Sequence, residues 1–295
     1  MSELTRPTPE AEKSRGTTRD PDFTSGPPTP AEILSSLGAD FGVCWDVLQE
    51  LTKDNTFNVE AFVETITKLH PEYLEHIKRG LEEDMMKLPE LMAKPAAALT
   101  SYGEAKKEYL AEFAKKYIER IEFYSRLKPP EKVPTGGKTV EQLEYELRQA
   151  NVNVSDYARE MMHKTKTKDK YGTFTTSKEA KTIDFVRLKV KDLFRDKKNH
   201  SFEEIIAKAE ELGLELCQSE DGPNYRLHYT NQLQWEWIWM GMKQISDSDG
   251  GPHVFRLGRV GGELWLRDFW TYPTFMWFPE VVFVLRLPSL SPQVT

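Results

Sequence analysis

Apolar residues recur at spacings of three and four along residues 30–128, which is the spacing of one face of a helix. The clearest face runs from Tyr73 to Leu88 between two prolines, and the longest follows Ser101 and ends near Tyr124. Glu and Lys fill most of the other positions, as on the solvent side of a helix. The pattern predicts a helical bundle of about five segments over residues 30–127.

The sequence KPPEKVPTGGK (residues 128–138) interrupts this pattern with three prolines and two adjacent glycines. Such a composition favours neither helix nor sheet, so residues 128–138 are predicted to be a linker. After it, Thr139 and Gln142 have the spacing of a capping box, and Ser155 is a predicted N-cap. Residues 139–163 are therefore predicted to be a helical connector, followed by a Lys/Thr-rich loop over 164–182.

From Ile183 the pattern changes to the alternation of β-strands. Ser201 and Glu204 predict a second capping box, opening a helix over 202–212 that ends at Gly213. Gly261 and Gly262 together form a hairpin signal. The predicted strands cover residues 183–190, 225–229, 235–245, 253–260, 263–270 and 281–287. The predicted fold class is α+β, an N-terminal helical bundle followed by a small C-terminal domain, residues 183–288, of mostly antiparallel strands with one packed helix.

Composition predicts a tail at each end of the chain and a cytoplasmic location. Residues 1–29 are rich in Pro, Thr, Ser, Glu and Arg and are predicted to be a disordered tail, and residues 289–295 form a short second tail. With only two cysteines, a disulfide framework and a cysteine-based zinc site are excluded. No apolar run is long enough to span a bilayer and the N-terminus has no apolar segment, so we expect a cytoplasmic protein without membrane contact.

Tryptophan is concentrated near the C-terminus, because six of the seven tryptophans lie between residues 235 and 277. In a strand over 235–245, alternate residues share a face, so Trp235, Trp237 and Trp239 are predicted to project together. They could form a binding platform, or they could pack on the helix over 202–212. Core packing is favoured for most of the rings, and a second apolar face then has to be covered. The candidate partner surface is Trp235, Trp237, Trp239, Trp270 and Trp277.

A basic stretch lies between His163 and His200. It holds 12 Lys and Arg against 5 Asp and Glu, a local charge of 12 − 5 = +7 in a chain whose net charge is −7. Such a stretch can bind phosphates, and it can equally be a solvated loop, which is the favoured interpretation because few aromatic residues accompany it. The candidate phosphate contacts are Lys164, Lys166, Lys168, Lys170 and Lys178.

No motif with a catalytic or metal-binding mechanism is found. SDSDGG (246–251) suggests a calcium loop, but the positions that would carry two of its acidic ligands are Gly251 and Gly258, so a turn is predicted. The histidines lack an HExxH pattern, glycine-rich phosphate loops are absent, and Cys44 and Cys217 are predicted to be small core residues. We therefore expect no cofactor, no metal and no catalytic site.

These observations predict a non-enzymatic interaction protein that engages another protein. The alternative is a nucleic-acid-associated protein that uses the Lys-rich segment 164–198. A third class, an enzyme with a non-standard site, would need a pocket that joins distant carboxylates or histidines.

The segments EELGLELCQSEDGPNYRLHY, ISDSDGGPHVFRLG and LWLRDFW carry a family resemblance. They resemble a C-terminal region of uncharacterised bacterial proteins, and TVEQLEYELRQANVNVSDYA and IDFVRLKV look like its companion segments. The resemblance covers residues 139–287, with Gln218 in place of a proline that the pattern carries. It implies a bacterial origin and a shared domain, and no activity is assigned to that group.

Overall fold

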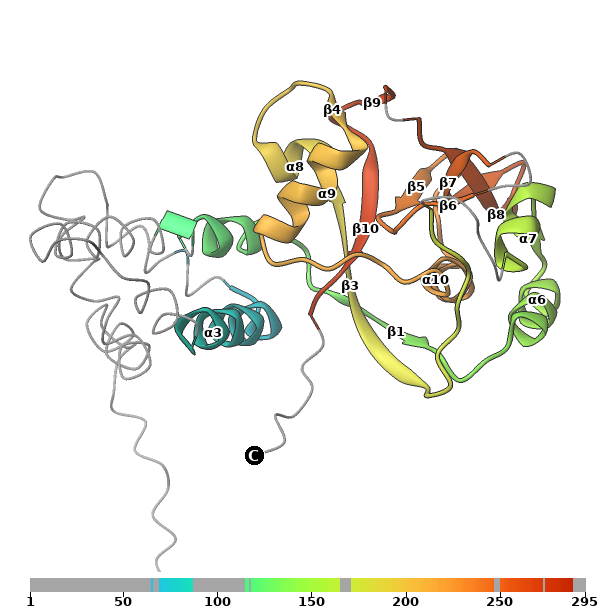
Figure 1. Ribbon diagram of the computed structural model, residues 1–295, viewed down its shortest axis with the longest axis horizontal. Coiled ribbons are helices and arrows are strands. Elements are labelled where there is room, and N and C mark those ends of the chain that lie inside the picture. The colour runs from blue at the N-terminus through green and yellow to red at the C-terminus, as the bar shows by residue number, and fades with distance from the viewer. Residues whose placement is uncertain are drawn as a thin grey trace, which may run out of the picture.

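The computed structural model describes residues 65, 69–86, 115, 116, 118–164, 171–246, 250–272 and 274–288, and its centre is an eight-stranded sheet (Figure 1). The strands follow the order β1-β3-β10-β5-β7-β8-β2, and β6 pairs with β7 beside this path. The β10–β5 and β2–β8 pairs are parallel, whereas the other pairs of the sheet are antiparallel. The strands are β1 (Glu131–Thr135), β2 (Val152–Val154), β3 (Lys181–Lys189), β5 (Trp237–Met240), β6 (Ile245–Ser246), β7 (Pro252–Val260), β8 (Glu263–Trp270) and β10 (Val282–Arg286). Two further strands, β4 (His200–Ser201) and β9 (Met276–Trp277), pair with each other.

Helices cover both faces of this sheet. On one face Gly222 of α10 lies against Phe255 of β7, and on the other Phe202 of α9 contacts Phe283 of β10. Figure 1 shows α8 and α9 together near β3 and β10, and α6 and α7 together beyond β8. The helices are α6 (Val140–Gln149), α7 (Asp156–Met162), α8 (Val190–Phe194), α9 (Phe202–Glu211) and α10 (Asp221–His228). None of the described helices combines the length and the hydrophobicity that a membrane crossing requires.

The predicted helix starts are confirmed. Thr139 and Gln142 form a capping box at α6, Ser201 and Glu204 form one at α9, and the Ser155 side chain accepts a hydrogen bond from the Ala158 amide at the start of α7. Each of these side chains satisfies a backbone N–H that has no partner within its own helix. These starts could be predicted because the interaction spans only three residues.

The predicted fold class is wrong, because the structure is a large, curled, mostly antiparallel sheet, and the residues that it describes contain no N-terminal bundle. The range 30–127 contributes α3 (Pro71–Met86) and the helical residues 115, 116 and 118–124. The other helices predicted there, and the two predicted tails, lie outside the described residues.

The described N-terminal helices pack on the sheet domain. The ring centroids of Tyr73 and Tyr124 are 5.1 Å apart, and the Tyr73 hydroxyl donates to the carbonyl of Lys128. The Lys208 ammonium of α9 donates to Glu119 at 2.7 Å. Helical periodicity shows that one face of a helix is buried, but not which element buries it.

Several further segments differ from prediction. Residues 152–154 of the predicted helical connector form β2, and of the predicted strand 235–245 only residues 237–240 and 245 lie in β5 and β6. Residues 131–135, within the predicted linker, form β1, which among the described strands pairs with β3 alone. Pro134 is tolerated there because an edge strand leaves alternate N–H groups unpaired. Residues 225–229, predicted as a strand, lie mostly in α10, whose first turn contains Asp221 and Pro223. A Cβ atom on Gly222 would lie 2.6 Å from the Phe255 ring, so a glycine is required where this helix meets the sheet.

His76 makes the docking of α3 sensitive to pH. It is buried, and neither ring nitrogen has a hydrogen-bond partner among the described residues. Burial lowers its pKa, which is opposed by the charge of Asp184. The folded pKa of His76 lies below the unfolded value of about 6.5, so folding favours the neutral imidazole. The contribution of neutral His76 to stability is complete above that pH and is lost as the pH falls below it. We expect the amide protection factors of residues 71–77, which correct exchange for its intrinsic pH dependence, to fall as the pH is lowered from about 7.5 to 5.5, and His76→Leu to flatten that fall.

The control for this prediction is His163→Gln, at an exposed histidine that contacts Glu144 of α6. It should keep the wild-type pH dependence of exchange in α3. Equal pH dependence in wild type and His76→Leu would assign the effect to another group.

Candidate functional site

Strands β5, β7 and β8 present aromatic and arginine side chains on one face of the sheet. Directly paired residues of antiparallel strands share a face, and the register pairs Trp237 with Gly258, Gly258 with Trp265, and Arg256 with Arg267. Trp239 also pairs with Arg256. We call this surface the aromatic–arginine face. It consists of Trp237, Trp239, Arg256, Trp265, Arg267 and Phe269, all half-buried.

Aromatic rings hold both guanidinium groups. The Cζ atom of Arg256 lies 4.4 Å from the centroid of the Trp237 ring and 5.2 Å from that of Phe269. The Cζ atom of Arg267 lies 4.1 Å from the Trp265 ring and 5.7 Å from the Trp237 ring. Each guanidinium is therefore attracted to two rings, which restricts the motion of a long side chain at this surface.

Gly258 supports the Trp237 ring. A Cβ atom at this position would lie 2.3 Å from Cζ3 of Trp237, well inside the van der Waals distance. On the other side of Gly258, Trp265 of β8 is its cross-strand partner. The absence of a side chain at Gly258 thus lets the Trp237 ring lie directly on the backbone of β7.

Among the described residues, the two arginines of the face have no ion-pair partner. Neither makes a hydrogen bond or ion pair with a described residue, and the Nε atoms of Arg256 and Arg267 are buried without an acceptor. Burial lowers the pKa of Arg256, the charge of Asp268 opposes this, and the charge of Arg267 lowers it further. The Asp268 carboxylate is itself occupied by His253 and Ser155, each at 3.0 Å. The face therefore presents two adjacent cations and unused N–H donors.

At one end the face continues into a buried aromatic cluster around Trp277. The ring centroid of Trp239 lies 5.6 Å from that of Trp277, which is 1% exposed. The Nε1 atoms of both tryptophans are buried and have no acceptor among the described residues. The other rings in contact with Trp277 are Phe202, Phe269, Phe275 and Phe283.

The five tryptophans of the predicted partner surface lie in different environments. Trp237 and Trp239 share a half-buried face, opposite the buried Ile238 and Met240. Trp235 precedes β5, has a φ of 67° and is 67% exposed, so the predicted alternation does not extend to it. Trp270 is exposed and stacks on Tyr272, with the ring centroids 4.3 Å apart, and Trp277 is buried.

Sequence reasoning missed Arg256 and Arg267, although a signal was present. The Gly261-Gly262 hairpin was predicted and both glycines have positive φ, which pairs Val260 with Glu263. Counting back along both strands from this turn places Arg256 opposite Arg267. Two like charges at paired positions between apolar residues are unfavourable unless another group compensates for them.

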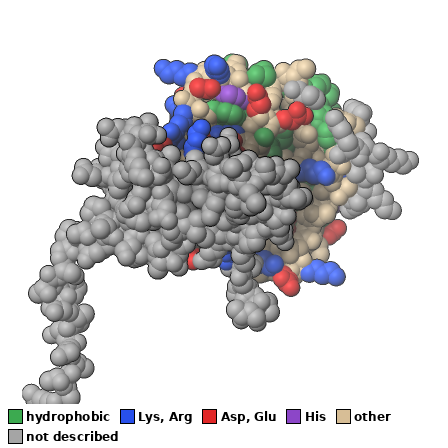
Figure 2. Space-filling model, turned by 60° about the vertical axis from the view of Figure 1, so that its left-hand side comes forward, with side chains coloured by type: hydrophobic (Ala, Val, Ile, Leu, Met, Phe, Trp, Pro, Cys, Tyr) green, Lys and Arg blue, Asp and Glu red, His purple; other side chains and the backbone are tan. Residues whose placement is uncertain are grey.

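Four cations of the basic stretch 164–198 are paired with acidic residues from elsewhere in the chain. Lys189 and Lys191 both donate to Glu280, at 2.6 and 2.5 Å, and their hydrogen bonds lower the pKa of Glu280 to about 2. Figure 2 shows basic and acidic side chains intermixed on the part of the described surface that is visible. Two further pairs of this kind are Arg187 with Glu131 and Arg195 with Glu122.

Of the candidate phosphate contacts, Lys166, Lys168 and Lys170 lie outside the described residues. Lys164 follows α7, and its carbonyl accepts a hydrogen bond from the Phe174 amide. Lys178 lies in the segment before β3. The structure therefore does not bring the five lysines together into one described site.

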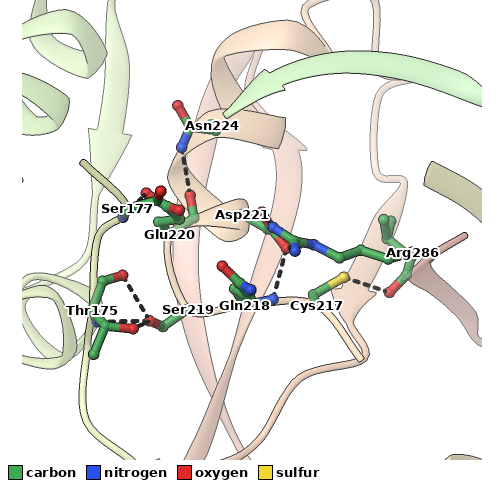
Figure 3. Close-up of polar contacts among 10 residues, drawn as sticks. Thr175, Ser177, Cys217, Gln218, Ser219, Glu220, Asp221, Asn224 and Arg286 are labelled. Atoms are coloured by element: carbon green, nitrogen blue, oxygen red, sulfur yellow. Dashed lines mark hydrogen bonds and ion pairs between the residues drawn. The ribbon is translucent and has the colours of Figure 1, made fainter. Parts of the chain in front are cut away.

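A buried polar cluster lies at the start of α10 (Figure 3). Arg286 of β10 donates two hydrogen bonds to the Asp221 carboxylate, from Nε at 2.5 Å and from Nη2 at 2.6 Å. The backbone amide of Gln218 donates to the same carboxylate at 2.7 Å. Glu220, next to Asp221, accepts from the Ser177 amide at 3.1 Å. Both carboxylates thus hold chain segments together.

The same cluster contains Cys217, which was predicted to be a core residue and is buried. Its Sγ donates to the carbonyl of Val284, and burial raises the pKa of the thiol. A buried neutral thiol is a poor nucleophile. Within the described residues no group of three or more His, Cys, Asp or Glu side chains could hold a metal ion. Cys44 and residues 247–249 of the SDSDGG turn lie outside those residues.

Neither a protein-family model, a curated protein sequence nor a solved structure matches this chain. The resemblance to uncharacterised bacterial proteins stays a prediction.

Proposed function

We propose that this chain is a non-enzymatic binding protein that engages another protein through the aromatic–arginine face. The observation that carries the proposal is the pair Arg256 and Arg267, which is held by aromatic rings and makes no ion pair with a described residue. Other cations of the same domain, such as Lys189 and Lys208, have acidic partners. Arg and Trp are enriched among the residues that dominate protein–protein binding energy.

The arrangement also limits the entropic cost of binding. A long side chain ordered by an interface loses about 0.5–1.5 kcal/mol of conformational freedom. Arg256 and Arg267 are already restricted by Trp237, Trp265 and Phe269. A partner that binds this face therefore meets a surface that is largely preorganised.

The nucleic-acid alternative has less support. Nucleic-acid surfaces need several free cations that neutralise successive phosphates. Arg187, Lys189, Lys191 and Arg195 of the basic segment are all within ion-pair distance of carboxylates. No specific observation among the described residues therefore favours that function.

The test is affinity capture from an extract of the source cell by three immobilised forms of the protein. These are wild type, Arg256→Gln/Arg267→Gln, and the control Lys189→Gln/Lys191→Gln, whose lysines both contact Glu280. We expect at least one captured protein to decrease by about tenfold or more with the arginine variant and to be retained by the control. Unchanged melting of the arginine variant would show that the fold is intact. Identical captured proteins for all three forms would refute the proposal.

A further inference from the structure

We infer that the partner presents a segment with one Glu or Asp between apolar residues and that this carboxylate binds between Arg256 and Arg267. This inference rests on the proposed function and names the chemistry of the occupant. The Cα register makes the two arginines direct cross-strand partners, so their Cβ atoms are about 4.5–5.5 Å apart. Their charges repel each other, and an anion between them would turn this repulsion into attraction.

The unused donors fit a carboxylate. The Nε–H groups of Arg256 and Arg267 are buried, so a partner reaches the other guanidinium nitrogens, which are not among the buried unpaired atoms and make no hydrogen bond with a described residue. A carboxylate has two oxygens that can accept from two guanidinium groups at once, and charged hydrogen bonds of this kind are the strong ones. Binding would therefore give both guanidinium groups a charged acceptor.

The rings around the arginines determine which residues of the partner segment can lie beside its carboxylate. Trp237 and Trp265 pair with Gly258 from opposite sides, and Phe269 contacts Arg256. A side chain next to the acidic residue would therefore lie on aromatic surface, so we expect aliphatic or aromatic neighbours. A segment with one Glu or Asp between apolar residues matches this pattern of charges and rings.

A peptide is favoured over a nucleic acid by the number and distribution of charges. The face has two arginines, and the whole chain has a net charge of −7. A single strand needs a groove of cations that follows its backbone over several nucleotides. One carboxylate needs only the two guanidinium groups that the face provides.

The inference is tested by fluorescence anisotropy with three labelled probes. The first is a short peptide with a single Glu between two Tyr residues, the second has Gln in place of that Glu, and the third is an oligothymidine. We expect wild type to bind the Glu peptide about tenfold or more tightly than the Gln peptide, because the charged hydrogen bonds are lost. In Arg256→Gln/Arg267→Gln the two peptides should bind equally. The control Lys189→Gln/Lys191→Gln should keep the wild-type preference.

Three results would overturn the inference: equal binding of the Glu and Gln peptides by wild type, no binding of the Glu peptide at about millimolar concentration, or tighter, arginine-dependent binding of the oligothymidine. If the affinity capture described above shows no protein whose capture depends on Arg256 and Arg267, the proposed function itself is refuted. If the Gln variant fails to fold, Arg256→Lys/Arg267→Lys keeps the charges but removes the planar donors. It should reduce the Glu preference while retaining part of it.

Discussion

Replacement of Trp277 by alanine is expected to lower the free energy of unfolding by about 3–5 kcal/mol. The side chain is 1% exposed, and Trp277 lies where β9, the sheet and α9 meet. Removing the indole loses its burial and leaves a cavity that the surrounding rings can fill only in part. The rings that line it are Phe202, Trp239, Phe269, Phe275 and Phe283.

Urea unfolding of Trp277→Ala beside Trp235→Ala measures this effect. Trp235 is 67% exposed, so its replacement should change stability by no more than about 0.5 kcal/mol. Equal losses in the two variants would contradict the different burial of these tryptophans. A large loss for Trp277 alone would show that the tryptophan-rich region contains both core and surface.

Arg286→Met is expected to destabilise the protein by about 3–5 kcal/mol, because it leaves the buried Asp221 carboxylate without its charged partner. Asp221 is fully buried and Arg286 is 6% exposed. After the substitution the carboxylate would keep only the amide of Gln218 as a donor, out of the three hydrogen bonds that it now accepts. One remaining neutral donor does not offset the desolvation of a charge.

Substitution of Asp221, the ion-pair partner of Arg286, provides the control. In Asp221→Leu/Arg286→Met neither charge remains, so the double variant should be more stable than the sum of the two single losses predicts. A double-mutant cycle from denaturant unfolding gives this coupling energy. Additive losses would show that Asp221 and Arg286 do not act as a pair.

Local patterns in the sequence predicted much of the C-terminal part of the chain. Strands β3, β7, β8 and β10 were predicted from alternation, and the helix starts at Thr139 and Ser201 from capping boxes. These signals act within one element. Which elements meet depends on contacts distant in sequence, and this is why α3 was assigned to a bundle and residues 131–135 to a linker.

The candidate site was predictable only in part for the same reason. Alternation predicted that Trp237 and Trp239 share a face, but the strained backbone at Trp235 could not be read from the sequence. That Arg256 and Arg267 have no ion-pair partner among the described residues depends on where Asp268 makes its hydrogen bonds. Conversely, the basic stretch looked like an anion site because its acidic partners, such as Glu280, lie far away in sequence.

The position of β10 has a consequence for biosynthesis. This strand follows all the other described strands in the chain, yet in the sheet it lies between β3 and β5. Until residues 282–286 leave the ribosome, the strand that joins β1 and β3 to β5, β7 and β8 is missing. The edges of β3 and β5 that β10 covers in the complete sheet are then open to pairing with other nascent chains. The complete sheet can therefore form only after the ribosome has released this strand.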